Sequence, residues 1–162
     1  MHEYVTGDIF TSRPPKQSLR AWEPFWDCVG ILFQLQHLEL VDGDEELPDW
    51  KLPWIAGIAL LRTIGHVLAK VDANKSRDHS REIEHFWRAL KSDRESSRIF
   101  WDFIENERNN LLKTYTFGAR LVRDEDGSYV EFNDGSDAFQ TFRQAVYWWR
   151  YQLSLIEAAI PN

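Results

Sequence analysis

The sequence predicts an all-α fold, an antiparallel bundle of about five helices with one β-hairpin inserted before the last helix. Three observations support this prediction. Apolar residues recur at alternating steps of three and four along residues 139–160, which is the period of one buried helix face. Proline and glycine separate the other long apolar segments. An alternating pattern typical of strands occurs in residues 119–132, where it flanks an Asp-Glu-Asp-Gly turn.

The size and composition of the chain favour a single domain. With 162 residues, of which 43% are hydrophobic, it can fill one core but not two. Residues 1–19 are predicted to be an extended N-terminal arm, because Pro14 and Pro15 cannot continue a helix and the segment has little apolar surface. Residues 20–162 are predicted to form the single helical-bundle domain.

The first two helices are separated by an acidic segment. A helix is predicted from about residue 22 to 40, followed by a loop over 41–52 that is rich in Asp and Glu. Pro53 suits the first turn of the next helix, predicted over 54–71. Because this second helix is apolar on most sides, we expect it to be central.

The remaining helices are delimited by capping residues. A third helix is predicted over about 78–91, and its many charged side chains are interpreted as a solvated face with ion pairs. Asp93 is a good N-cap for a fourth helix over 94–115, which Gly118 is expected to end. Ser136 is the predicted cap of the last helix.

Charge and cysteine content bound the environment and the partners. The net charge of −7 argues against nonspecific binding to nucleic acid, although a local basic surface is compatible with it. The lone Cys28 excludes an intramolecular disulfide, and residues 1–10 lack the pattern of a signal peptide. The longest apolar run, 54–61, is shorter than the roughly 18 residues of a membrane span. A cytoplasmic protein without a membrane span is expected.

Two helices carry polar residues on faces that are otherwise apolar. At 100° per residue, Glu107 falls on the apolar face of the fourth helix, and a buried charge is unfavourable by several kcal/mol unless it is paired. Arg62, His66 and Lys70 form a stripe on the second helix, so Arg62 or His66 is predicted to meet Glu107 across the bundle. This cluster is either a structural salt bridge or a polar pocket for a ligand, and the sequence leaves both open.

The segment Glu-Arg-Asn-Asn-Leu-Leu-Lys-Thr-Tyr at 107–115 resembles a motif of the HEPN superfamily of helical-bundle proteins. In that motif an Arg, usually followed by a polar residue, precedes a His by four to six positions, and some toxin members add a Tyr two residues after the His. Arg108, Asn109 and Tyr115 match this pattern. Lys113 stands in place of the His.

The resemblance implies metal-independent RNA cleavage at a dimer interface, with the Arg stabilising phosphate charge and the His acting as general acid or base. A lysine with an ordinary pKa of about 10.4 is not a base at neutral pH, but it can bind phosphate. The expected function is therefore a HEPN-like domain that binds RNA or a nucleotide, with weak or no ribonuclease activity, in bacterial stress response or phage defence. Its candidate catalytic residues are Arg108, Asn109, Lys113 and Tyr115.

The alternative is a non-catalytic module that forms homodimers. Trp148, Trp149 and Tyr151 on the last helix are the expected contacts, because Trp and Tyr are favoured interface anchors. No cofactor and no structural metal are expected. Glu82 and His85 supply only one Glu-x-x-His element, whereas di-iron bundles use two.

Overall fold

The computed structural model describes residues 16–41 and 50–162, with residues 39–41 described for their backbone alone. Within this part of the chain it confirms a mostly α fold with a hairpin before the last helix. The π-helical segment η2 continues directly into α5, and the two together form one of five long helical units. The elements are α2 (Trp22–Val41), α3 (Lys51–Lys70), η1 (Asp72–Asn74), α4 (Arg77–Ser92), η2 (Ile99–Glu105), α5 (Asn106–Thr114), β1 (Ala119–Asp124), β2 (Gly127–Phe132) and α6 (Ala138–Ala159).

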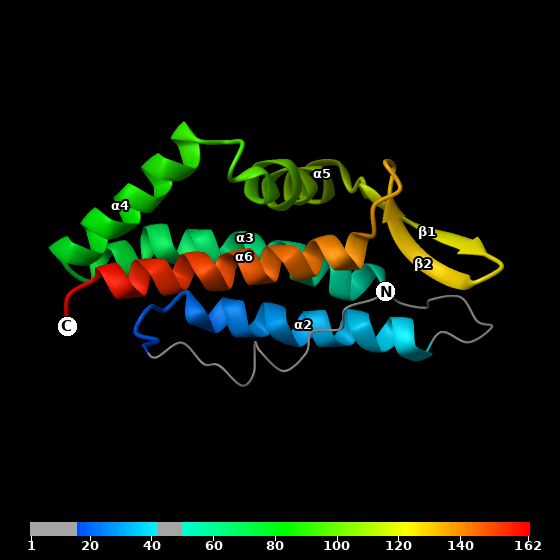
Figure 1. The fold of residues 1–162 in the computed structure, drawn as a ribbon, viewed down its shortest axis with the longest axis horizontal. Coiled ribbons are helices and arrows are strands. Elements are labelled where there is room, and N and C mark those ends of the chain that lie inside the picture. Colours follow the sequence, from blue (N-terminus) through cyan, green and yellow to red (C-terminus); the bar gives the residue numbers. More distant parts are fainter. Residues whose placement is uncertain (1–15, 42–49) are drawn as a thin grey trace.

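The helices form three layers. Helices α3 and α6 lie side by side in the middle, α2 covers one side, and α4 with η2–α5 covers the other (Figure 1). Helix α2 runs opposite to both α3 and α6, and η2–α5 runs opposite to α3. The antiparallel hairpin pairs Ala119 with Phe132 and Asp124 with Gly127, and it lies at one end of the bundle.

The centre of the core is an aromatic cluster around Trp54 on α3. Its ring is fully buried, and four phenylalanine rings surround it with centroid distances of 5.8 to 6.2 Å. These rings come from η2, β2 and α6: Phe103, Phe132, Phe139 and Phe142. The ring of Trp54 therefore contacts elements that are distant in sequence. This agrees with the central position that was predicted for α3 from its apolar composition.

The same apolar composition gives α3 a second property. In the described part of the chain, the segment Lys51–Asn74 is long and apolar enough to cross a membrane, judged by length and composition alone. In this fold it is the central helix, and it contacts α2 in one outer layer and η2 and α5 in the other. A core helix needs the same composition, so the expected absence of a membrane span stays a prediction.

Several boundaries differ from those predicted. The fourth helix is not one α-helix over 94–115, because residues Ile99–Glu105 form a π-helix before α5 begins. Helix α5 ends at Thr114, where Tyr115 adopts a left-handed conformation with φ of 52°, so Gly118 does not end it. The cap of α6 is Asp137, whose side chain accepts from the backbone N–H of Gln140, and not Ser136.

The start of α2 is held by two buried carboxylates from other elements. Asp72 in η1 accepts hydrogen bonds from the backbone N–H groups of Arg20 and Ala21 at 2.7 and 2.9 Å. Glu157 on α6 accepts from the N–H of Leu19 at 2.7 Å and from Trp22 Nε1 at 3.1 Å. Residues 16–19 of the predicted arm therefore lie against the bundle. Residues 1–15 of that arm, and 42–49 of the predicted acidic loop, lie outside the described residues.

Candidate functional site

The predicted pairing of Glu107 with Arg62 or His66 is wrong. Glu107 is buried, and its carboxylate accepts hydrogen bonds from Trp54 Nε1 at 3.2 Å and from the backbone N–H of Gly118 at 3.1 Å. A Cβ at position 118 would collide with Oε2 of Glu107, so the carboxylate would have to shift to admit any other residue. Glu107 thus ties α5 to α3 and to the segment before the hairpin.

Burial raises the pKa of Glu107 above its ordinary value, although the hydrogen bonds from Trp54 and Gly118 act in the opposite direction. Both donors to this carboxyl group, Trp54 Nε1 and the N–H of Gly118, belong to the protein itself. Glu107 therefore has a structural role as a hydrogen-bond acceptor in the core. Because Glu107 contacts neither Arg62 nor His66, these two side chains have other neighbours.

Arg62 pairs instead with Glu105 in η2, with Nε and Oε2 2.5 Å apart. The reason for the difference is the π-helix, in which i→i+5 hydrogen bonds widen each turn. Counting 100° per residue from Phe100 therefore misplaces Glu105, which faces Arg62, whereas Glu107 is buried as that count predicts and meets Trp54 of α3. The guanidinium of Arg62 also lies over the Phe100 ring, 5.6 Å from its centroid.

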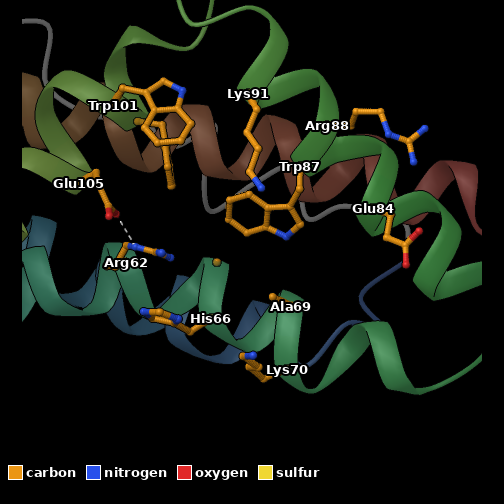
Figure 2. A pocket seen from close by; sticks show the side chains of 12 residues that line it. Arg62, His66, Ala69, Lys70, Glu84, Trp87, Arg88, Lys91, Trp101 and Glu105 are labelled. Carbon is orange, nitrogen blue, oxygen red and sulfur yellow. Dashed lines mark ion pairs between the residues drawn. The ribbon is translucent and has the colours of Figure 1, made fainter.

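The Arg62–Glu105 pair forms part of the wall of a cavity of about 820 Å³ between α3, α4 and η2. Figure 2 shows the side chains that line it, with Arg62, His66 and Lys70 on α3 across from Trp87 and Lys91 of α4. The complete lining is Arg62, Gly65, His66, Ala69, Lys70, Glu84, Trp87, Arg88, Lys91, Phe100, Trp101 and Glu105.

Cationic groups outnumber carboxylates around this cavity. Arginine and lysine contribute four of the lining residues, and glutamate contributes two, one of which is already paired with Arg62. The pKa of His66 lies below its ordinary value, chiefly through desolvation and then through the positive charges of Arg62 and Arg108. His66 is therefore a neutral imidazole at pH 7 beside several permanent cations. An otherwise acidic protein therefore has a local excess of positively charged side chains here.

One wall of the cavity is aromatic. Trp87 and Phe100 pack edge to face at 5.8 Å, and Trp101 packs on Phe100 at 5.0 Å. Trp101 Nε1 donates to the carbonyl of Leu90 at 3.0 Å, which fixes its ring. The ring of Trp87 lies close against the backbone of Gly65, where a Cβ would be 2.9 Å from Cη2 of the indole.

The four candidate catalytic residues on and after α5 are only partly brought together. Arg108 Nη1 donates to Asn109 Oδ1 at 2.8 Å, and the charge of Arg108 acts on His66. Lys113 is exposed near the C-terminal end of α5. Tyr115 is also exposed and packs on Phe117 with a centroid distance of 5.3 Å. Only Arg108 is linked to the cavity, through its electrostatic interaction with His66.

Sequence reasoning identified the α3 side of this site and missed the other side. Trp87 and Lys91 are four residues apart on α4, but the charged residues of that helix were interpreted as a solvated face. The interleaving of tryptophan with basic residues in 87–101 was the available signal, since aromatic and basic side chains together favour binding of nucleic acid.

The three residues of the predicted dimer contact differ in exposure. Trp149 is fully buried, and Trp148 packs on Trp149, Phe86 and Phe100. Tyr151 is 62% exposed. Of the three, only Tyr151 offers a large surface to a partner.

The described residues contain no cluster of typical metal ligands. Among residues 16–41 and 50–162, no three His, Cys, Asp or Glu side chains lie close enough together to hold a metal ion.

Comparison with known proteins found no family model, no curated protein and no solved structure that matches this chain. Its function is therefore inferred from the geometry and charge of its own side chains.

Proposed function

We propose that this chain is an RNA- or nucleotide-binding helical domain, similar to the HEPN superfamily, with weak or no ribonuclease activity. The observation that carries the proposal is the cavity between α3, α4 and η2, which combines an aromatic wall with an excess of cations in a protein of net charge −7. A nucleotide has the matching parts, a flat base and an anionic phosphate.

The dimensions of the cavity suit this ligand. Small-molecule sites have volumes of about 300 to 1,000 Å³, and this one has about 820 Å³. Stacking of a base on an aromatic side chain contributes roughly 1 to 3 kcal/mol in single-stranded nucleic-acid complexes. The volume and the aromatic wall therefore support binding of at least one nucleotide unit.

The distribution of basic side chains suggests the path that a longer nucleic-acid strand would follow across the surface. Arg62, His66 and Lys70 follow one face of α3, and Arg108 on α5 is close enough to influence His66. A strand with one base in the cavity would have neighbouring phosphates along this row of basic groups. Arg108 would then bind phosphate at the edge of the site, which agrees with the role that the HEPN resemblance implies.

The proposal includes only weak cleavage because Lys113 of α5 stands where the HEPN motif has the His that serves as general acid or base. Lys113 is exposed, and an exposed lysine binds phosphate as a cation. His66, which lines the cavity, is the candidate base, since its lowered pKa favours the neutral imidazole that can accept a proton from a ribose 2′-OH. Any cleavage should then depend on His66 and Arg108 and continue in EDTA.

The test compares two double variants with the same change in charge. The purified protein is incubated in EDTA with labelled single-stranded and structured RNAs, and both binding and cleavage are measured. Lys70→Gln with Lys91→Gln removes two cations of the cavity, whereas Arg77→Gln with Arg123→Gln removes two exposed cations elsewhere. Arg108→Ala is included for the cleavage assay.

The expected result is at least tenfold weaker RNA binding for the cavity variant and a change below threefold for the control. Equal weakening in both would mean nonspecific charge attraction and would contradict a defined site. If the unmodified protein binds none of these RNAs, the proposed RNA-binding function is wrong.

The homodimerising module remains a second candidate because of one observation. Tyr151 and Leu155 are four residues apart on α6, and both are largely exposed, at 62% and 49%. Analytical ultracentrifugation of Tyr151→Glu with Leu155→Glu tests this. A dimer that becomes a monomer would favour the module, and a monomer in both forms would exclude a dimer through this face.

A further inference from the structure

An unsatisfied hydrogen-bond donor lies at the aromatic wall of the cavity. Nε1 of Trp87 is buried and has no hydrogen-bond partner within the described residues. By contrast, the indole nitrogens of Trp22, Trp54 and Trp101 all donate hydrogen bonds. A buried donor without an acceptor is destabilising, so native structures rarely keep one without a reason.

Trp149 provides an internal comparison. Its Nε1 is likewise buried without a partner in the described part of the chain, but Trp149 is fully enclosed in the core and does not line the cavity. Trp87 is only partly buried and lines the cavity directly. In Figure 2 the nitrogen of Trp87 is on the edge of the indole that faces α3. A ligand in the cavity would contact the Trp87 indole and could reach this donor once the ring moves away from α3, whereas Trp149 is not in the lining.

The surroundings of Trp87 indicate what kind of acceptor fits. The indole packs against Gly65 on α3 and against the rings of Phe86 and Phe100. A phosphate placed among these apolar groups would lose its hydration, and the cation beside them, Arg62, is already paired with Glu105. A neutral acceptor, such as a carbonyl oxygen or ring nitrogen of a base, carries no such penalty.

The other three cations of the lining stand farther out. Lys70, Arg88 and Lys91 are all exposed. Lys91 lies one helical turn after Trp87, and Figure 2 shows its side chain extending from α4 toward α3. A phosphate is therefore better placed at this rim than beside the indole.

We propose that the cavity holds one nucleotide unit with an acceptor atom of its base on Trp87 Nε1 and its phosphate at the rim near Lys91, which rests on the proposed nucleotide- or RNA-binding function. Trp87 is then a specificity-determining residue. A base is selected by whether it presents an acceptor at this position. The unit is either a free nucleotide or one residue of a single strand.

The test observes the donor directly by NMR. The full-length protein is labelled with ¹⁵N, and the indole N–H resonances of Trp87 and Trp149 are assigned from the spectra of Trp87→Phe and Trp149→Phe. The unmodified protein is then titrated separately with each of the four nucleoside 5′-monophosphates, with a short single-stranded RNA, and with inorganic phosphate. Affinity is measured in parallel by calorimetry.

The Trp87 indole resonance is expected to move with base-containing ligands and to stay in place with inorganic phosphate, while the Trp149 resonance stays in place throughout. Movement with mononucleotides identifies a free nucleotide as a sufficient ligand. Movement with RNA alone identifies a strand. Trp87→Phe, which keeps an aromatic ring and removes the donor, should weaken binding by about tenfold.

Three results would overturn the inference. If calorimetry shows binding that Lys70→Gln with Lys91→Gln abolishes, but the Trp87 resonance does not move, the proposed function survives and the role of Trp87 is wrong. If the Trp87 and Trp149 resonances move equally, a general conformational change is responsible. If none of the ligands binds, the proposed function fails together with the inference.

Discussion

Trp54 on α3 donates a hydrogen bond from its indole Nε1 to the buried carboxylate of Glu107 on α5, across 3.2 Å. The same carboxylate accepts from the backbone N–H of Gly118, which precedes the hairpin. Because the ring of Trp54 is the centre of the aromatic core, this contact positions α5 from inside the bundle. The orientation of Arg108, the next residue, depends on it.

Removing this carboxylate should destabilise the fold. In Glu107→Ala, Trp54 Nε1 and the N–H of Gly118 lose their acceptor inside the core, and the free energy of unfolding should fall by about 3 kcal/mol. Urea unfolding followed by circular dichroism measures the change. Glu125→Ala in the exposed hairpin turn is the control and should stay within about 0.5 kcal/mol. A loss below about 1 kcal/mol in Glu107→Ala would contradict the structural role.

The raised pKa of Glu107 predicts how stability depends on pH. A carboxyl group whose pKa is higher in the folded than in the unfolded state stabilises the fold fully below its unfolded pKa, and this contribution is lost as pH rises through the folded pKa. Glu107→Gln cannot ionise. The unfolding free energy of the unmodified protein, minus that of Glu107→Gln, should therefore decrease as pH rises above the ordinary value of 4.5. Urea unfolding of both proteins across this range checks it, and a difference that grows with pH would show the opposite sign.

Glu105 should oppose the binding of anions in the cavity. Glu105→Gln removes a negative charge that Arg62 now neutralises, so affinity for the labelled RNA should increase about threefold to tenfold. The lost ion pair, which is partly exposed, should lower stability by about 1 kcal/mol. Glu95→Gln makes the same change of charge at a highly exposed position outside the cavity lining. If fluorescence anisotropy gives equal gains for both variants, Arg62 is not a ligand-binding group of this site.

Two glycines in helices allow a matched test of the close contact between α3 and α4. A Cβ at Gly65 would lie 2.9 Å from Cη2 of Trp87, whereas a Cβ at Gly30 on α2 would meet nothing within 4 Å. Alanine at Gly30 should stabilise the protein by about 1 kcal/mol through helix propensity. Alanine at Gly65 should cancel that gain and destabilise by up to about 2 kcal/mol, because the indole must move.

Thermal and urea unfolding of both alanine variants measure this difference. The displaced indole should also weaken RNA binding in Gly65→Ala and leave it unchanged in Gly30→Ala. Equal stabilisation by the two substitutions would contradict this prediction, because it would mean that the Trp87 indole moves away from residue 65 at little energetic cost.

The local elements follow from short-range sequence patterns. The three- and four-residue spacing along α6, the apolar stretch that became α3, and the Asp-Glu-Asp-Gly turn of the hairpin each depend on neighbouring residues, so they were predictable. Helix ends were less predictable. Tyr115, rather than glycine, takes the left-handed position after α5.

The tertiary structure decided which polar residues meet. The π-helical segment turns Glu105 toward Arg62, whereas Glu107 lies on the buried face that the sequence predicted and meets Trp54 and Gly118 there. The cavity needs Trp87 and Lys91 of α4 to lie opposite the basic face of α3, and that placement follows from the packing of whole helices. Periodicity shows that a helix has a polar face, but the partner across that face depends on helix phase and packing, which no local pattern encodes.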